Sequence, residues 1–145
     1  MKRKGSAVWK GGLKDGKGTV STESGALKGT QYSFSTRFEN GVGTNPEELL
    51  AAAHAGCFSM ALSNQLGQAG MTADSIETTA TVTLEKLESG FAITAVHLDV
   101  TARIPGGDQA KFEQAAANAK AGCPVSKLFN AKITMDAKLV AERAA

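Results

Sequence analysis

The chain has 145 residues and a mass of 15.0 kDa, a length typical of one domain. Apolar residues make up 42% and charged residues 21% of it, which excludes wholesale disorder, and two cysteines are too few for a disulfide-rich secreted scaffold. Sixteen Lys and Arg residues against fourteen Asp and Glu residues give a net charge of +2, too weak a bias to indicate a nucleic-acid partner. We therefore expect a single domain over residues 1–145.

The first part of the chain has the pattern of β-structure. Residues 6–10 and 18–22 are short strand candidates separated by glycines. Residues 32–38 alternate in the period of two that is typical of a strand. In such a strand Phe34 and Phe38 would share one face, and Arg37 would project from the other.

A long helix is the clearest local signal. Asn45 is a favourable N-cap, Pro46 suits the first helical position, and Glu47 and Glu48 suit both a capping box and the helix dipole. We expect this helix over residues 46–66. Its middle is apolar nearly all round, so it must be buried on most sides, in part by a second subunit.

The remaining pattern predicts a hairpin with one polar face, a helix capped by Asp108, a short helix and a last strand. The alternation and the end signals place these elements over residues 78–85, 96–104, 109–121, 124–129 and 133–139, with fraying over 141–145. The order of elements indicates an α+β fold, with antiparallel sheets around a long buried central helix.

No membrane segment is expected. The longest apolar stretch, residues 49–62, is interrupted by His54 and Ser59 and is shorter than the roughly 18 residues that a spanning helix needs. No signal-peptide pattern or lipidation motif is present. The chain therefore reads as soluble and cytoplasmic, with thiols kept reduced.

The two cysteines lie in different settings. Cys57 is in the middle of the predicted long helix, where a cysteine is often a small buried apolar residue. Cys123 lies between Gly122 and Pro124, at the start of the predicted short helix, and helix N-termini lower thiol pKa values. Two cysteines 66 positions apart are compatible with unrelated residues, part of a metal site or a redox couple.

The histidines do not favour a metal site. The chain has no CxxC, and neither His54 nor His97 has ligand spacing to a cysteine. His54 and Cys57, at i and i+3 of one helix, could touch, although a lone helical histidine is usually structural. His97 falls on the polar face of its predicted strand, so we expect it to be an ordinary surface residue. The sequence assigns no role to either histidine.

Arg37 and the two glutamates have an ordinary interpretation and a chemical one. A single arginine is usually a surface charge, and glutamates at a helix start are usually capping residues. An ion pair between Arg37 and Glu47 or Glu48 would instead hold a guanidinium near the helix. Such a cation would favour a thiolate and donate hydrogen bonds to a polar substrate.

Residues 44–62, TNPEELLAAAHAGCFSMAL, and residues 121–126, AGCPVS, together resemble the two cysteine motifs of the OsmC/Ohr family of thiol peroxidases. Residues 18–25, GTVSTESG, and residues 35–38, STRF, are similar to its OsmC branch. The resemblance covers nearly the whole chain and implies an intertwined homodimer with two active sites at the subunit interface. It also implies reduction of organic hydroperoxides and, more weakly, of hydrogen peroxide.

The resemblance assigns roles by position. Cys57 would be the peroxidatic thiolate, Cys123 the resolving thiol, Arg37 the activating cation, and Glu47 rather than Glu48 the carboxylate that holds it. Cys57 would become a sulfenic acid and then a disulfide with Cys123, which an external dithiol, of the lipoyl type in this family, would reopen.

An apolar wall would favour organic substrates, and its expected residues are Phe58, Met60 and Leu49. No metal, haem or flavin cofactor is expected. The other partners implied are the hydroperoxide, a dithiol reductant protein and a second copy of the chain. The alternatives are a non-enzymatic redox sensor or ligand-binding dimer of the same fold, and a structural dimer whose cysteines are merely buried.

Overall fold

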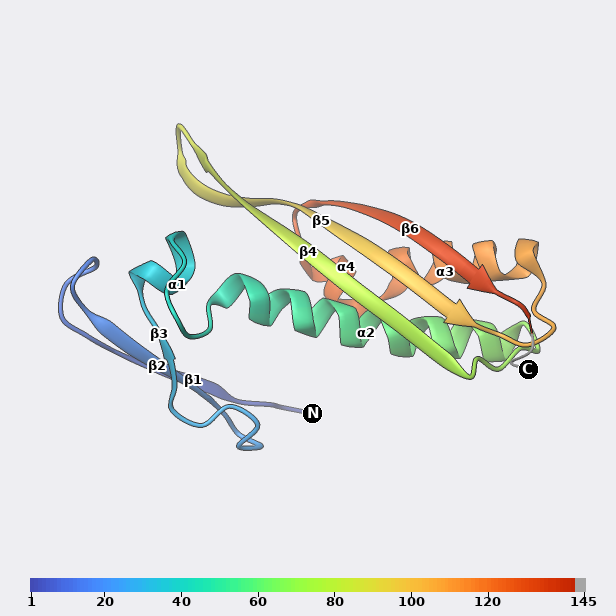
Figure 1. Cartoon of the computed structure of the whole chain (residues 1–145), viewed down its shortest axis with the longest axis horizontal. Coiled ribbons are helices and arrows are strands. Elements are labelled where there is room, and N and C mark those ends of the chain that lie inside the picture. Colours follow the sequence, from blue (N-terminus) through green and yellow to red (C-terminus); the bar gives the residue numbers. More distant parts are fainter. Residues whose placement is uncertain (143–145) are drawn as a thin grey trace. The chain divides into compact units, whose positions relative to one another are not determined.

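The computed structural model describes residues 1–142, so the end of the expected fraying segment, residues 143–145, lies outside the described residues. Figure 1 shows the order of the elements, and they divide into two compact units, residues 1–49 and the chain from Leu50 onward. The elements are β1 (Gly5–Lys10), β2 (Lys17–Thr22), β3 (Thr30–Tyr32), α1 (Phe34–Phe38), α2 (Pro46–Gln68), β4 (Ser75–Leu87), β5 (Gly90–Arg103), α3 (Gln109–Gly122), α4 (Pro124–Leu128) and β6 (Lys132–Val140). The expectation of one domain over residues 1–145 stays a prediction.

The first unit contains an antiparallel sheet in the order β1-β2-β3. Gly18 of β2 pairs with Trp9 on one side and Tyr32 on the other. A Cβ at position 18 would lie 2.6 Å from the Trp9 ring and 2.5 Å from the Tyr32 ring. Only glycine therefore lets the two aromatic rings approach to a centroid distance of 5.4 Å across the central strand.

The strand predicted over residues 32–38 is wrong beyond its first residue. β3 ends at Tyr32, and Ser33 caps the short helix α1. The Ser33 N–H donates to Thr36 Oγ1 over 2.8 Å and Ser33 Oγ accepts from the Thr36 N–H, which is a capping box. Phe34 and Phe38 still share a face, because residues four apart are neighbours on a helix, and their ring centroids are 4.9 Å apart.

Helix α2 begins at Pro46 as predicted, and the Glu48 N–H donates to Asn45 Oδ1 over 2.8 Å at its start. The expected burial on most sides is not found within one chain. From His54 onward the buried residues of α2 recur every four positions and form one stripe, whereas the residues on the other sides include exposed ones. The stripe is His54, Phe58, Leu62 and Leu66, and the exposed residues include Ala52, Ala53, Gly56 and Met60. Although α2 has 23 residues, no helix in the described part of the chain has the length and apolar character to cross a bilayer.

The second unit contains a mixed sheet in the order β4-β5-β6. The predicted hairpin of β4 and β5 is antiparallel, but β6 runs parallel to β5, with Val96 opposite Ile133. The expectation of purely antiparallel sheets is therefore wrong here. The chain crosses back through α3 and α4 before β6, and a crossover of that kind delivers a parallel strand.

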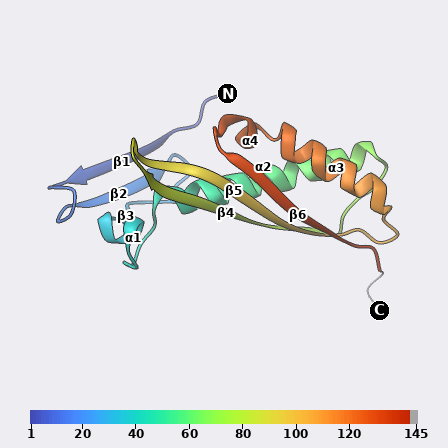
Figure 2. The same ribbon diagram turned by 90° about the horizontal axis from the view of Figure 1, so that it is seen from above.

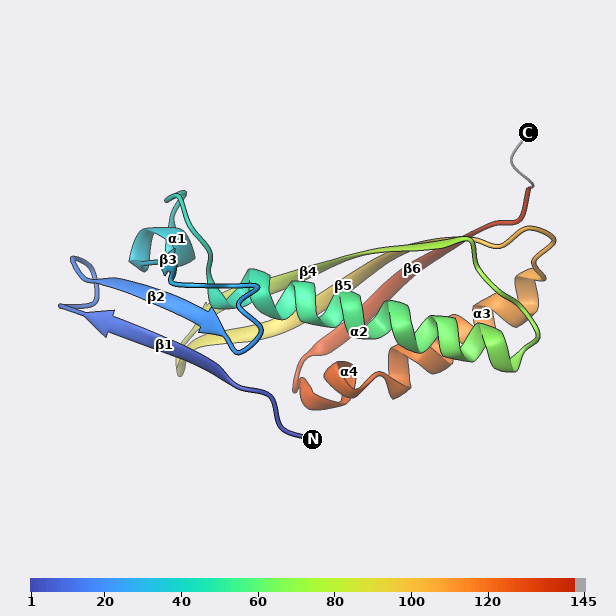
Figure 3. The same cartoon turned by 90° about the horizontal axis from the view of Figure 1, so that it is seen from below.

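One face of this sheet carries the hydrophobic core. Figures 2 and 3 view the second unit from opposite sides and show α2 and α3 on the same face of the sheet. The buried apolar side chains come from α2, β5, the loop after it, α3 and the α3–α4 junction: Phe58, Leu62, Leu66, Val96, Leu98, Val100, Ala102, Ile104, Phe112, Ala115, Ala116, Ala119 and Cys123. Within residues 1–142, all buried apolar side chains belong to the second unit.

Candidate functional site

The two cysteines, 66 positions apart in the sequence, meet in the second unit. Cys57 lies on α2 and is partly buried, whereas Cys123 lies between α3 and α4 and is fully buried. Both are free thiols, and Cys123 Sγ donates a hydrogen bond to Cys57 Sγ over 2.8 Å. The Cys123 N–H donates to Ala119 O over 2.9 Å, so the end of α3 fixes the backbone that carries this thiol.

The surroundings of Cys57 favour its neutral thiol. Burial raises the pKa of the Cys57 thiol, and the neighbouring Cys123 side chain raises it further. A hydrogen bond with the Val125 backbone acts in the opposite direction but does not reverse the shift. A nucleophilic thiolate at Cys57 therefore needs a cation that is not among these neighbours.

The first unit holds Arg37 in an ion pair with Glu47. Arg37 Nε donates to Glu47 Oε1 over 2.9 Å, and Arg37 Nη2 lies 2.8 Å from the same oxygen. Glu47 is buried, and its Oε2 has no hydrogen-bond partner among the described residues. The Arg37 guanidinium also lies over the Phe38 ring, 5.2 Å from its centroid. The side chain of Arg37 stays 39% exposed.

The loop between α1 and α2 sets the position of this pair. Asn45 Nδ2 donates to Thr36 O over 3.0 Å, which joins the start of α2 to α1. The carboxylate of Glu48 accepts from Thr44 Oγ1 over 2.7 Å, so Glu48 supports the loop and does not close the expected capping box with Asn45. Gly43 has a φ of 138°, and a Cβ there would lie 2.6 Å from Gln31 O. Only glycine fits this turn.

The residues expected to form an apolar wall do not gather on one side of α2. Phe58 has no exposed surface and packs in the core, whereas Met60 is 78% exposed. Two positions apart on a helix, these two side chains point to opposite sides. Leu49 is partly buried. Within this chain, Phe58 offers no surface to a substrate.

The first unit contains an aromatic cavity that sequence reasoning missed. Its volume is about 240 Å³, and it is lined by Trp9, Leu13, Tyr32, Ser33, Phe34, Arg37 and Phe38. The signal was the concentration of aromatic residues before residue 40, but the strand assigned to residues 32–38 concealed it. The structure thus brings Arg37 together with apolar rings that were not assigned a function.

His54 is fully buried and lies beside the segment that carries Cys123. Its Nε2 is 2.7 Å from Ser126 Oγ, and its ring meets the Phe129 ring edge-on at 5.2 Å. Its Nδ1 has no hydrogen-bond partner among the described residues. Burial lowers the pKa of His54, so the ring is neutral near pH 7. Ser126 was missed by sequence reasoning, because nothing local connects it to a helix 72 positions earlier.

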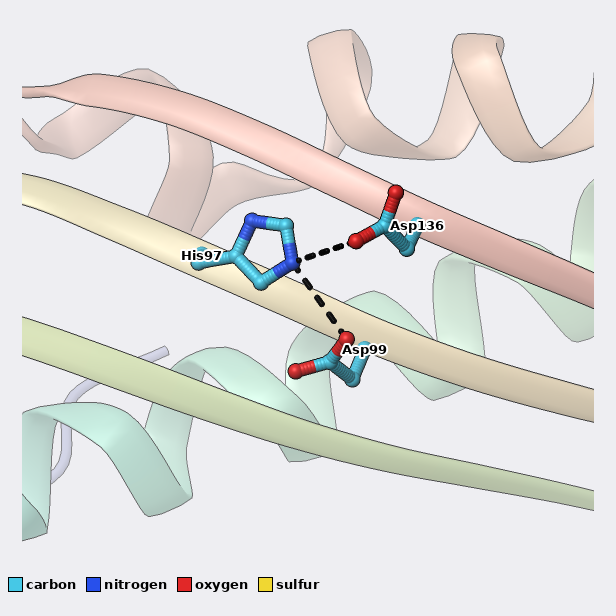
Figure 4. Close-up of side chains that lie close together, drawn as sticks. All are labelled: His97, Asp99 and Asp136. Carbon is cyan, nitrogen blue, oxygen red and sulfur yellow. Dashed lines mark hydrogen bonds and ion pairs between the residues drawn. The ribbon is translucent and has the colours of Figure 1, made fainter.

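His97 is part of a polar network rather than an isolated surface residue (Figure 4). Its Nδ1 lies 2.6 Å from Thr134 Oγ1, and its Nε2 lies 3.1 Å from Asp136 Oδ2 and 3.3 Å from Asp99 Oδ1. One nitrogen and two carboxylate oxygens within 4.8 Å of one another are donors that a divalent cation accepts. The two carboxylates are exposed, on the sheet face opposite the helices.

Comparison with protein-family models matches residues 38–138 to the model described as OsmC-like protein. This range contains Glu47 and both cysteines and begins one residue after Arg37. Curated relatives named peroxiredoxin OsmC, from Escherichia coli strain K12 and from Shigella flexneri, are each 56% identical over 137 residues. The match covers 94% of this chain and 96% of each relative.

Solved structures share the fold. The organic hydroperoxide resistance protein OhrB of Bacillus subtilis matches with a TM-score of 0.68 and 25% identity, over 93% of this chain and 98% of that one. An OsmC-like protein from Mycoplasma pneumoniae matches with a TM-score of 0.76 over 97% of this chain and 98% of that one. At 14% identity the second likeness concerns the fold alone.

Proposed function

The chain belongs to the OsmC family, and from that premise we propose that it is a thiol peroxidase that uses Cys57 and Cys123. The observation that carries the proposal is the contact of two free thiols at 2.8 Å, one partly buried and one fully buried. A buried disulfide between them requires their sulfur atoms to approach by less than about 1 Å. The names of the curated relatives, peroxiredoxins, support the same class of reaction.

In the proposed cycle the Cys57 thiolate attacks one peroxide oxygen, and the O–O bond breaks. The leaving alkoxide takes a proton and departs as the alcohol, and Cys57 becomes a sulfenic acid. The Cys123 thiolate then attacks the Cys57 sulfur, the S–O bond breaks, and the hydroxide departs as water after protonation. An external dithiol reduces the Cys57–Cys123 disulfide in two exchange steps and is itself oxidised to a disulfide.

Arg37 is proposed to stabilise the Cys57 thiolate and to donate hydrogen bonds to the peroxide oxygens. The raised pKa of Cys57 supports the need for such a cation. Glu47 is proposed to fix the direction of the guanidinium, which it holds through two nitrogens. Thiol chemistry supplies both steps, so the proposal includes no metal, haem or flavin.

An organic hydroperoxide is proposed as the preferred substrate. The aromatic cavity of about 240 Å³ that Arg37 lines supports this preference, because apolar walls bind an alkyl or aryl group and gain nothing from hydrogen peroxide. Of the residues first expected to form the wall, Met60 and Leu49 remain candidates for contact with the substrate. The Bacillus subtilis relative is named for organic hydroperoxide resistance.

A homodimer is proposed as the functional unit. The first unit contributes no buried apolar side chain among the described residues, and Val8, Leu13 and Val42 are largely exposed. A segment of 49 residues without a core of its own needs cover from elsewhere. The exposed side of α2, with Met60, needs cover for the same reason. A cytoplasmic setting and a lipoyl-type protein as the dithiol complete the proposal.

The test mixes reduced protein with cumene hydroperoxide or with hydrogen peroxide in a stopped-flow instrument and then counts thiols and measures the intact mass. The expected result is rapid loss of both thiols with a mass decrease of two hydrogen atoms per chain, faster with the organic peroxide. A dithiol should then restore both thiols through repeated cycles. Retention of both thiols would reject the peroxidase, and oxidation without repeated cycles would favour a redox sensor.

A further inference from the structure

A second link joins the same two segments that the cysteines join. His54 lies on α2 three residues before Cys57, and Ser126 lies on α4 three residues after Cys123. The 2.7 Å contact between His54 Nε2 and Ser126 Oγ therefore runs beside the contact between the two sulfur atoms. Both links connect α2 to the segment 123–126, and they lie about one helical turn apart.

The segment that carries Cys123 depends on such contacts for its position. Helix α4 has only five residues, and helices of that length do not persist without tertiary contacts. Cys123 occupies its N-cap but makes no side-chain cap hydrogen bond, and Pro124 has no N–H to contribute. Within α4, the buried polar side chain is Ser126.

The hydrogen bond between His54 and Ser126 is buried, so its loss has a large free-energy cost. His54 has no exposed surface, Ser126 is 7% exposed, and the Phe129 ring packs edge-on against the imidazole ring. In such surroundings, loss of one partner leaves the other buried without a hydrogen bond. His54 already has one unpartnered nitrogen, so apolar side chains at both positions 54 and 126 would fill this site with fewer unsatisfied polar atoms. Core packing alone thus does not account for a histidine here.

We propose that His54 is a positioning residue, whose hydrogen bond to Ser126 holds Cys123 against Cys57. The inference rests on the proposed function only in taking the Cys57–Cys123 disulfide as the product of oxidation. His54 is not assigned a proton-transfer role, because its hydrogen-bond partner is Ser126, whereas Cys57 Sγ accepts a hydrogen bond from Cys123 Sγ. The link raises the effective concentration of one thiol at the other.

The experiment measures the equilibrium between the Cys57–Cys123 dithiol and its disulfide in glutathione redox buffers, with no peroxide present. Ser126→Ala and His54→Leu remove the link from its two sides, and each should lower the effective concentration of the pair by about tenfold. The double variant should fall no further than either single variant, because both remove one interaction. Ser126→Thr keeps the hydroxyl and should stay within about twofold of the unsubstituted chain.

Ser59→Ala is the matched control. Ser59 lies on α2 two residues after Cys57, and its Oγ is 2.8 Å from Thr78 Oγ1 on β4, so this variant loses a comparable link that does not involve the Cys123 segment. Its disulfide equilibrium should not change. A drop in Ser59→Ala equal to that in Ser126→Ala would overturn the proposal, because it would indicate general loosening of α2.

The outcomes separate this proposal from the proposed function. One outcome overturns the positioning role alone. The unsubstituted chain forms the Cys57–Cys123 disulfide, and Ser126→Ala and His54→Leu have the same dithiol–disulfide equilibrium as that chain. No Cys57–Cys123 disulfide in the unsubstituted chain overturns the resolving step and the positioning role together. Circular dichroism of each reduced variant checks the fold, and if either single variant does not fold, the other carries the test.

Discussion

In the proposed cycle Cys57 attacks the peroxide as its thiolate, and the side chain nearest to it, Cys123, disfavours that form. Burial raises the pKa of Cys57, and the neighbouring Cys123 side chain, whose Sγ lies 2.8 Å from Cys57 Sγ, raises it further. The same contact that prepares the disulfide thus makes the first step harder. A cation must offset this, and Arg37, held by Glu47 with 39% of its side chain exposed, is the one we propose.

Arg37→Ala should slow the oxidation of Cys57 by cumene hydroperoxide by about a hundredfold at pH 7. Because the raised pKa of Cys57 then stands uncompensated, the rate should keep rising with pH beyond the range where the unsubstituted chain levels off. Stopped-flow rates over a pH series check both effects. Arg103→Ala, at an exposed position on β5, is the control, and equal rates in the two variants would remove the activating role.

Cys123→Ser should leave the first oxidation intact and abolish resolution. The Cys57 sulfenic acid then persists, and further peroxide converts it to a sulfinic acid. Intact mass should show the gain of one and then two oxygen atoms instead of the loss of two hydrogens. Repeated turnover of this variant with a dithiol would contradict the resolving role.

His54 should make the folded chain less stable in mild acid. Burial lowers the pKa of His54, so below about pH 6.5 the unfolded chain binds a proton that the folded chain refuses. The free energy of unfolding therefore has its full value above that pH, and it decreases as the pH falls towards the lowered pKa of His54. Urea unfolding of the reduced protein at pH 7.5 and 5.5 measures the loss. The free energy of unfolding of His54→Leu should fall less between pH 7.5 and 5.5 than that of the unsubstituted chain. An equal fall in both would contradict a lowered pKa of His54 in the folded chain.

At the scale of elements, short-range signals and close approaches determine what each segment does. The Ser33–Thr36 capping box turns the chain from β3 into α1 and carries Arg37 on a helix instead of a strand. In the sheet before it, Gly18 lets Trp9 and Tyr32 meet across β2, and both rings line the aromatic cavity. The absence of a side chain at Gly18 therefore allows this cavity to form.

Gly18→Ala should destabilise the protein by about 1–3 kcal/mol, because the new Cβ would lie within 2.6 Å of two aromatic rings. Gly67→Ala is the matched control, since a Cβ at this position in α2 meets no heavy atom within 4 Å. It should be neutral or stabilise the helix by roughly 0.5–1 kcal/mol. Urea unfolding compares the two variants, and equal stabilities would contradict the proposed close fit.

At the scale of the whole molecule, one chain leaves several large apolar side chains exposed, among them Leu13, Val42 and Met60. The buried stripe of α2 packs under β5 and against α3, while Met60 on another side is 78% exposed. The first unit adds no buried apolar side chain within residues 1–142. A second copy of the chain is the cover that we propose.

Met60→Glu should weaken the dimer, because it places a charge on the exposed side of α2 that the partner is proposed to bury. Sedimentation equilibrium should give twice the 15.0 kDa chain mass for the unsubstituted protein and a concentration-dependent lower mass for the variant. Thr79→Glu, on the polar face of the sheet, should leave the mass unchanged. A monomeric unsubstituted protein would reject the dimer.

Local signals in the sequence were sufficient for most elements and for the family. The Asn45 cap predicted the start of α2, the alternation over residues 78–85 and 96–104 predicted the β4–β5 hairpin, and Asp108 predicted the start of α3. These signals act between residues a few positions apart, so a single segment contains them. The two cysteine motifs identified the family for the same reason, since each is a continuous run of residues.

Tertiary structure decided what depends on distant segments. The parallel pairing of β6, the contact of Cys57 with Cys123 and the bond of His54 to Ser126 all require α3 to return the chain to α2. The period of two over residues 32–38 also contained a four-residue spacing, and the capping box selected the helix. Proximity between residues 66 or 72 positions apart comes from packing, which no local pattern encodes.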